Sequence, residues 1–192
     1  MPGSRASEAQ RREQILTAAF RVAARKGLES MTVRDVAAEA GLSSGLVFFH
    51  FETKEALLLA MLDELVEWML SGREEASAGS SHYVNLLREE SNLDAQDREW
   101  LELFIEFLVF GSRRSEMRKH LREALKHYRK IFHSPANELL QAHAKSLPNT
   151  TPESLSALGA SLVIGNALQA LLDPKWMDLE KPLSAIEDVW GK

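Results

Sequence analysis

The sequence predicts an all-α protein of about nine helices, with a small N-terminal domain at residues 1–53 and a larger helical domain at residues 54–192. Apolar side chains recur every three or four residues along most of the chain, which is the spacing of an amphipathic helix. Residues that cap helices precede several of these runs, and Gly or Pro follows them. Residues 1–54 hold 8 Lys and Arg against 6 Asp and Glu, whereas residues 55–192 hold 15 against 22. The formal charge therefore changes from +2 to −7 near the proposed domain boundary.

The first helix is expected at residues 8–26, with Gly27 as its stop. Arg11 and Arg12 lie in its first turns, where the helix dipole disfavours positive charge. A phosphate nearby would resolve this conflict, and an ordinary exposed arginine is an equal alternative.

Residues 31–54 read as two short helices joined by a tight turn. Thr32 can cap the first of them with Asp35 as the reciprocal partner of a capping box. Gly41 supplies the left-handed residue that ends this helix, and Ser43 caps the second. The sequence therefore predicts a helix-turn-helix arrangement.

The second of these short helices has two unlike faces. If Val47 points into the core, Phe51 lies beside it, because each residue advances by about 100°. The opposite face is then made by Gly45, Leu46, Phe48 and Phe49. An apolar, aromatic surface that faces outward on a short helix indicates a binding partner.

Duplex DNA is the partner that this arrangement predicts, because the second helix of such a motif enters the major groove. Apolar side chains can touch thymine methyl groups there, and Gly45 allows the backbone to approach phosphate. Lys54 follows the expected cap Thr53, where a cation is disfavoured unless an anion lies nearby. The predicted DNA contacts are Thr32, Arg34, Ser43, Ser44, Gly45, Leu46, Phe48, Phe49, His50 and Lys54.

The motif LSSGLVFFHF at residues 42–51, with TVRDVA before it and TKE after it, closely resembles the DNA-binding domain of TetR (tetracycline-repressor-like) regulators. The resemblance implies a homodimeric, all-helical transcription regulator, usually a repressor, that leaves its operator when a small molecule enters the second domain. The family usually has Tyr where this chain has Phe48. The phosphate contact that the hydroxyl commonly makes would then be apolar or absent here.

The larger domain is expected to continue in helices at residues 54–70, 82–91, 95–112, 116–133, 152–172 and 182–190, with a loop at 71–81. On the third of these helices, Glu99, Glu102, Glu106 and Arg113 form one polar stripe. We interpret the stripe as a solvated face rather than a wall that binds a cation. This helix and the basic helix after it are also weakly similar to the choline-responsive branch of the TetR family, without a specific motif.

The basic helix that follows places His120, Glu123 and His127 on one face, so a zinc site is geometrically possible. A solvated face is the favoured reading, because no fourth ligand is near in the sequence. The Ser-Pro pair at 134–135, with Ser as a cap and Pro at the first helical position, predicts a kink or a restart that runs to about residue 145.

The terminal helices carry more apolar surface than one small domain readily buries. The resemblance implies that they form a four-helix bundle with their copies in a second subunit. The predicted dimerisation residues are Leu155, Leu158, Leu162, Ile186 and Trp190.

An effector pocket is expected among the aromatic and methionine-rich helices of the second domain. Its predicted lining is Trp68, Trp100, Phe104, Phe107, Tyr128 and Asn166. Ordinary core packing is the alternative for each of them. Asn166 stands apart, because a polar amide on an apolar helix face needs a partner.

Several functional classes are disfavoured. The absence of cysteine excludes disulfides, thiolate metal sites and cysteine catalysis. No Gly-rich phosphate loop, H-E-x-x-H or G-x-S-x-G motif is present, so we expect neither an enzyme nor a cofactor. No stretch approaches the roughly 20 uninterrupted apolar residues that span a membrane, and no signal peptide is recognisable, so we expect a cytoplasmic protein. The remaining alternative is a helical protein-interaction module whose aromatic helix binds a protein partner.

Overall fold

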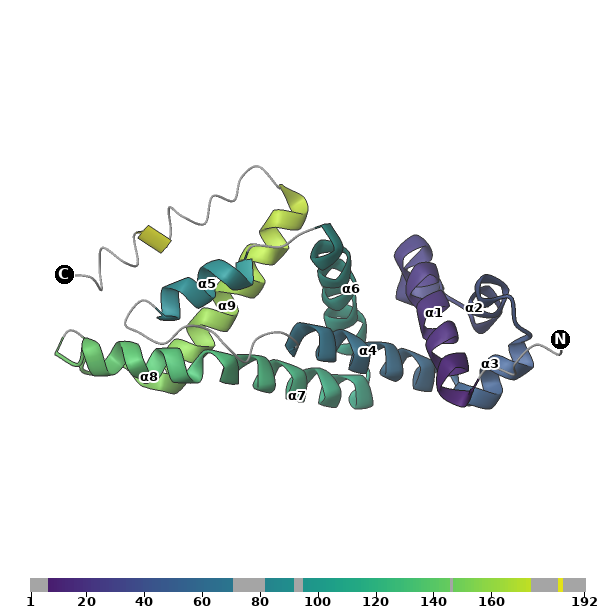
Figure 1. Cartoon of the computed structure of the whole chain (residues 1–192), viewed down its shortest axis with the longest axis horizontal. Coiled ribbons are helices and arrows are strands. Elements are labelled where there is room, and N and C mark those ends of the chain that lie inside the picture. The colour runs from purple at the N-terminus through teal and green to yellow at the C-terminus, as the bar shows by residue number, and fades with distance from the viewer. Residues whose placement is uncertain (1–6, 71–81, 92–94, 146, 174–182, 185–192) are drawn as a thin grey trace. The chain divides into compact units, whose positions relative to one another are not determined.

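A computed structural model describes residues 7–70, 82–91, 95–145, 147–173 and 183–184. All regular structure in these residues is α-helical, which confirms the predicted fold class (Figure 1). The helices are α1 Glu8–Ser30, α2 Val33–Ala40, α3 Ser44–Phe51, α4 Lys54–Leu70, α5 His82–Ser91, α6 Ala95–Gly111, α7 Ser115–Ile131, α8 His133–Ala142 and α9 Pro152–Leu172. The expected loop at 71–81 and most of the expected helix at 182–190 fall outside the described residues.

The chain forms two compact units. The first consists of residues 1–68 and 103–120, and the second of residues 69–102 and 121–192. Helices α1, α2 and α3 lie wholly in the first unit, together with most of α4. The division at residue 53 that the sequence predicts stays a prediction.

The core of the first unit is apolar and tightly closed. Its buried side chains come from the apolar faces of α1, α2, α3 and α4, and each is at most 4% exposed. They include Ile15, Ala19, Val22, Leu28, Val36, Val47, Phe51, Leu57, Leu58, Met61 and Leu62. Val47 and Phe51 lie in this core as their helical spacing predicts. Leu28 follows the expected end of the first helix at Gly27 and was not predicted.

α1 ends in two steps. The helix breaks at Gly27, where φ is 76° and ψ is 159°, and one further turn continues to Ser30. A positive φ of this size is open to glycine and strained for other residues. Gly27 does interrupt the helix as predicted, although the helical turn after it extends the element.

Three aromatic residues organise the second unit. The Tyr83 and Tyr128 rings both meet the Phe132 ring edge-on, with centroids 6.3 Å and 5.6 Å apart. The Tyr83 hydroxyl donates to the Leu155 carbonyl at 2.6 Å, and burial raises the pKa of Tyr83 to about 12. At Gly159, an added Cβ would lie 2.7 Å from the Tyr83 oxygen, so glycine permits the close approach of α9.

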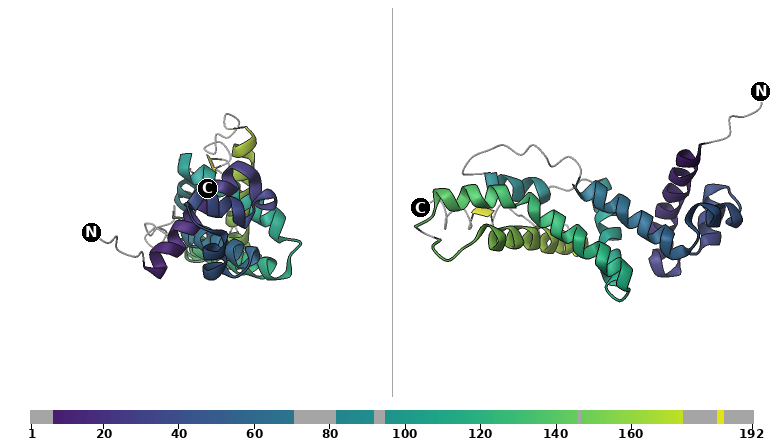
Figure 2. Two further views of the ribbon diagram at one scale, coloured as in Figure 1. Left: turned by 90° about the vertical axis from the view of Figure 1, so that its right-hand side faces the viewer. Right: turned by 90° about the horizontal axis from the view of Figure 1, so that it is seen from below.

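The break after α7 resolves into two helices separated by Phe132, and the chain bends where they meet (Figure 2). The predicted Ser134 cap is wrong, because α8 begins at His133 and its N-cap residue, Phe132, makes no side-chain cap. The helix thus starts two residues earlier than predicted, next to the fully buried Phe132 ring. Pro135 is tolerated in the first turn, where its missing N–H would have no helical acceptor.

α9 is the one helix among the described residues that is long and apolar enough to cross a membrane. Length and composition are its only indications, and the core helix of a soluble protein passes the same test. Leu155, Gly159, Val163 and Asn166 are buried along one face of this helix. That face packs within the second unit, as the core helix of a soluble protein does.

Candidate nucleic-acid interface

The helix-turn-helix forms as the caps predict. The Thr32 hydroxyl accepts a hydrogen bond from the Asp35 amide at 3.2 Å, while an Asp35 carboxylate oxygen accepts from the Thr32 amide at 3.1 Å. Gly41 ends α2 in the left-handed conformation, with φ at 66°. The Ser43 hydroxyl then accepts from the Leu46 amide at 3.2 Å and starts α3.

α3 buries one face and exposes the other. Val47 and Phe51 are 1% and 4% exposed, whereas Phe48 and Phe49 are 47% and 76% exposed. The Phe49 ring lies edge-on to the His50 ring, with centroids 5.2 Å apart. The predicted division of this helix into a core face and an uncovered aromatic face is confirmed.

None of the ten predicted DNA contacts is buried. Thr32, Arg34, Ser43, Gly45, Phe48 and Phe49 are exposed, and Ser44, Leu46, His50 and Lys54 are half-buried. The Thr32 and Ser43 side chains serve as helix caps, but a hydroxyl that accepts a hydrogen bond can still donate one. All ten residues therefore keep solvent-exposed surface, and their contact with DNA stays a prediction.

Arg12 holds α3 in place, a role that sequence reasoning missed. Its guanidinium donates to the His50 carbonyl at 2.6 Å and lies 4.3 Å from the centroid of the Phe51 ring. Gln14 similarly donates to the Ala40 carbonyl at 2.8 Å, at the end of α2. These contacts join residues 26 to 38 positions apart, so no local pattern could have revealed them. Arg12 needs no phosphate to explain its position.

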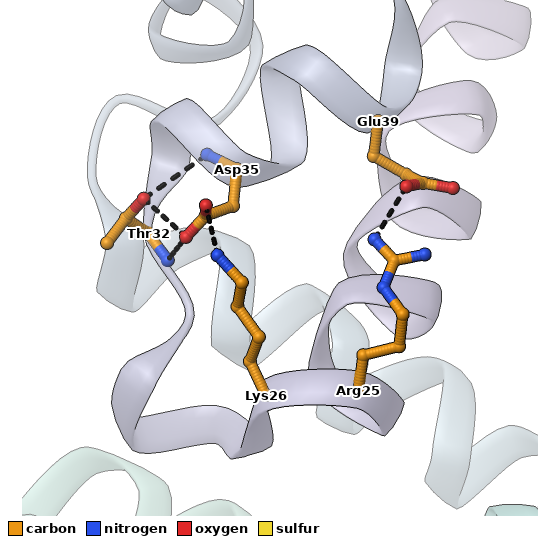
Figure 3. Close-up of polar contacts among 5 residues, drawn as sticks. All are labelled: Arg25, Lys26, Thr32, Asp35 and Glu39. Carbon is orange, nitrogen blue, oxygen red and sulfur yellow. Dashed lines mark hydrogen bonds and ion pairs between the residues drawn. The ribbon is translucent and has the colours of Figure 1, made fainter.

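Ion pairs fasten α2 to α1 at the surface (Figure 3). The Lys26 Nζ atom lies 2.5 Å from Asp35 Oδ1, and the Arg25 Nη2 atom lies 2.7 Å from Glu39 Oε2. The Lys26 bond, with the Thr32 bond second, lowers the pKa of Asp35 to about 2. The hydrogen bond from Arg25 likewise lowers the pKa of Glu39. Both carboxylates therefore stay ionised at neutral pH, and α2 is held against α1.

Lys54 has a partner within the chain. Its ammonium donates to the Glu29 carbonyl at 3.1 Å, just after the break in α1. This bond accounts for a cation at the start of α4 without a phosphate. The ammonium has three donors, so two remain for other acceptors.

Glu106 departs from the predicted solvated stripe. Its carboxylate accepts a hydrogen bond from the Leu28 amide at 2.6 Å, and the side chain is half-buried. Glu99 and Glu102 are exposed, as the solvated reading expects. The interpretation of Glu106 is corrected, because the broken end of α1 lies against it and supplies a donor.

The predicted effector contacts are divided between the units. Trp68, Phe104 and Phe107 lie in the first unit, and Trp100, Tyr128 and Asn166 in the second. Phe104, Phe107, Tyr128 and Asn166 are buried, whereas both tryptophans are half-buried.

Two buried polar groups distinguish the second unit. Asn166 is 4% exposed, and its Oδ1 atom has no hydrogen-bond partner among the described residues. Tyr128 donates to the carboxylate of Glu90 at 2.8 Å, and Glu90 is only 6% exposed. Sequence reasoning missed Glu90, because an acid next to Glu89 near the end of a helix reads as surface.

The predicted dimerisation residues differ in their exposure. Leu155 is buried within the chain, Leu158 is 53% exposed and Leu162 is half-buried. Ile186 and Trp190 lie outside the described residues. Leu168 and Leu172, which were not predicted, are 46% and 83% exposed on the same side of α9 as Leu158.

The possible zinc ligands do not assemble a site. His120, Glu123 and His127 are all exposed, and Glu123 pairs with Lys126 at 3.2 Å. Within the described parts of the chain, no three His, Asp or Glu side chains come close enough together to hold a metal ion.

Comparison with known proteins agrees with this geometry. Residues 15–61 match the family described as "Bacterial regulatory proteins, tetR family". The transcriptional repressor KstR2 of Mycolicibacterium smegmatis is 35% identical over 68 residues, which is 35% of this chain and 33% of that protein. The chain thus matches about a third of the length of this curated relative.

Solved structures match over nearly the whole chain. A transcriptional regulator from Rhodococcus is 26% identical, with a TM-score of 0.73 over 94% of both chains. A regulator from Saccharomonospora viridis in complex with choline has a TM-score of 0.77 over 94% of this chain and 95% of that one; at 17% identity this shows the fold alone. With the exposed aromatic face of α3 and the capped turn before it, these matches show that residues 15–61 are similar to the DNA-binding domain of the TetR family and that the chain has the fold of a TetR-type transcriptional regulator.

Proposed function

We propose that this protein is a ligand-responsive transcriptional regulator, and specifically a repressor that binds a near-palindromic operator as a homodimer. One observation carries the proposal: Phe48 and Phe49 lie exposed on α3, while the opposite face of this helix is buried and its last turn is held by Arg12. Large aromatic side chains rarely remain exposed without a partner.

The major groove suits this surface. It is wide enough for an α-helix, and the thymine methyl group offers an apolar contact to Phe49. The exposed Gly45 lets the helix backbone come near the phosphates, and the Ser43 hydroxyl and the uncapped amides of α3 can donate to them. A dimer would place two such helices about 34–36 Å apart, which favours a near-palindromic site.

The exposed side of α9 supports the homodimer. Leu158, Leu168 and Leu172 recur at helical spacing there, and an added Cβ at Gly165 would meet nothing within 4 Å. An apolar stripe with a small residue in its middle allows close packing against the same stripe of a second copy.

Release by a small molecule is the finer part of the proposal. Within the described part of the chain the buried Asn166 oxygen finds no partner, which supports a ligand that donates a hydrogen bond, because an unsatisfied buried acceptor costs about 1–3 kcal/mol. The Saccharomonospora protein was solved with choline, so a chain of this fold can accommodate a small molecule. The effector of the present protein is a separate question.

The alternative function is that α3 binds a protein partner. The salt dependence of binding distinguishes this alternative from DNA binding. Duplex binding should weaken steeply between about 50 and 200 mM salt, since several phosphates are neutralised, whereas an apolar protein contact should not. We would select duplexes from a random pool and titrate the recovered sequence in a gel-shift assay. Phe49→Ala should reduce discrimination among sequences, whereas Lys54→Ala should weaken all duplexes alike.

The control is Val109→Ala, an exposed apolar residue far from α3 in sequence and outside the proposed dimer stripe, which should leave sequence discrimination unchanged. If no duplex is recovered, or if neither Phe49→Ala nor Lys54→Ala changes binding, the DNA-binding proposal is wrong.

A further inference from the structure

We infer that Glu106 is a positioning residue that fixes the DNA-binding helices through the broken end of α1, and so restricts which half-site spacing the dimer accepts. The inference rests on the proposed function.

The break at Gly27 creates the contact. Its φ of 76° takes the chain out of the α1 helix, so the Leu28 amide loses the acceptor that a continuous helix would supply. Glu106 Oε1 accepts from that amide at 2.6 Å in a part-buried setting. A charged acceptor in such a place makes one of the stronger hydrogen bonds in proteins.

The contact is also sterically specific. A Cβ at position 27 would lie 2.9 Å from Glu106 Oε1, a separation that real Cβ atoms essentially never show. Glycine at this position therefore serves two purposes, since it allows the positive φ and leaves space for the carboxylate.

The same short segment is bound from two other helices. Lys54, the first residue of α4, donates to the Glu29 carbonyl, and Lys26 pairs with Asp35 at the start of α2. Residues 26–29 therefore join α1 to α2, α4 and α6 through single polar contacts. A hydrogen bond weakens steeply when its angle is distorted. A small movement of one helix can therefore break such a contact while the apolar core stays closed.

α6 connects this junction to the predicted effector contacts. Glu106 lies between Phe104 and Phe107, two buried residues that the sequence places among the effector contacts. A ligand that shifts α6 would move the carboxylate away from the Leu28 amide. Loss of that bond would free the end of α1, and with it α2 and α3, to change orientation.

The test measures spacing discrimination. The probes are a duplex recovered by selection and the same duplex with one or two base pairs inserted at its centre. Wild-type protein should bind the longer duplexes about tenfold more weakly, because its recognition helices have a fixed separation. Glu106→Ala should reduce this ratio to below about threefold, while its affinity for a single half-site stays unchanged.

Two variants separate positioning from general stability. Glu106→Gln keeps an oxygen acceptor and should retain most of the discrimination, and Glu102→Ala, on an exposed position of the same helix, should retain all of it. Amide hydrogen exchange at Leu28 should accelerate in Glu106→Ala and stay slow in Glu106→Gln. If Glu106→Ala does not fold, Gly27→Ala perturbs the same contact and should lower the discrimination in its place.

Equal spacing discrimination in wild-type and Glu106→Ala protein would overturn the inference, as would a Glu106→Gln variant that behaves like Glu106→Ala. The proposed function would remain intact in both cases. Failure of the wild-type protein to select any duplex would overturn the proposed function itself, and this role with it.

Discussion

The two units place their polar side chains differently. In the first, the polar contacts that join α1 to α2 lie at the surface, as between Arg25 and Glu39. In the second, His82, Glu90 and Asn166 are all at most 8% exposed. A buried polar group must find its partner, whereas an exposed one can use water. The polar contacts described in the first unit are therefore exposed or part-buried, whereas the second unit encloses buried polar side chains.

The largest expected effect lies in the crowded interior of the second unit. Gly159→Ala would bring a methyl group to 2.7 Å from the Tyr83 oxygen and 2.8 Å from the Phe132 ring. We expect a loss of about 1–3 kcal/mol in the free energy of unfolding, which outweighs the helix propensity gained. Urea unfolding followed by circular dichroism measures it.

Gly165→Ala is the matched control on the same helix, because nothing lies within 4 Å of its added methyl group. In an isolated chain it should raise stability by up to about 1 kcal/mol. If α9 pairs with its copy at this position, the variant should instead weaken the dimer in sedimentation measurements. Equal destabilisation by both substitutions would contradict the distinction between the two faces of α9.

Tyr128→Phe tests the buried polar pair. It removes one hydrogen bond from the Glu90 carboxylate, which should cost about 1–3 kcal/mol of unfolding free energy. Tyr83→Phe should cost less, because the Leu155 carbonyl is neutral and keeps its bond within α9. The urea unfolding midpoints of the two variants measure this difference in stability. A larger loss in Tyr83→Phe than in Tyr128→Phe would show that Glu90 is well solvated.

Thr32→Ala addresses the surface contacts of the first unit. It removes the hydroxyl of the capping box at α2, so we expect a loss of about 1 kcal/mol. Thr32→Ser keeps the hydroxyl and should restore most of it. Thermal unfolding of the three proteins provides the measurement, and an unchanged midpoint for Thr32→Ala would mean that the cap contributes nothing to stability.

The smallest expected effect is on the stability of the protein at acidic pH. Because the Lys26 bond holds the pKa of Asp35 near 2, below its usual value of about 3.9, its contribution to stability is complete above about pH 4 and is lost as the pH falls toward 2. Asp35→Asn should be less stable than wild type at neutral pH, and the difference should shrink on acidification. A difference independent of pH from about 6 to 2 would exclude the ionised pair as its source.

Local signals predicted the first unit well, for physical reasons. Caps such as Thr32 and Ser43 act on amides within three residues, so a sequence shows cause and effect side by side. Helical spacing likewise separated Val47 and Phe51 from Phe48 and Phe49. The predicted DNA face follows directly from these two kinds of pattern.

Contacts between distant positions could not be predicted in this way. Glu106 meets Leu28 across 78 residues, and Tyr128 meets Glu90 across 38. Each glutamate sits in a stretch that reads as a solvated helix face, and only the packing of another helix supplies its donor. The break at Phe132 was misplaced for the same reason, since its ring is fixed by two tyrosines and not by the nearby proline.

The bond from Arg12 to the His50 carbonyl has an evolutionary consequence. Arg12 binds the main-chain carbonyl of residue 50 and not its side chain. Any amino acid at position 50 that leaves the helix intact presents the same carbonyl. Gly45, Phe48 and Phe49 take no part in that attachment or in the Val47–Phe51 packing. Under the proposed function, duplicated copies of such a gene can therefore acquire new operators by changing outward side chains while the fold is inherited intact.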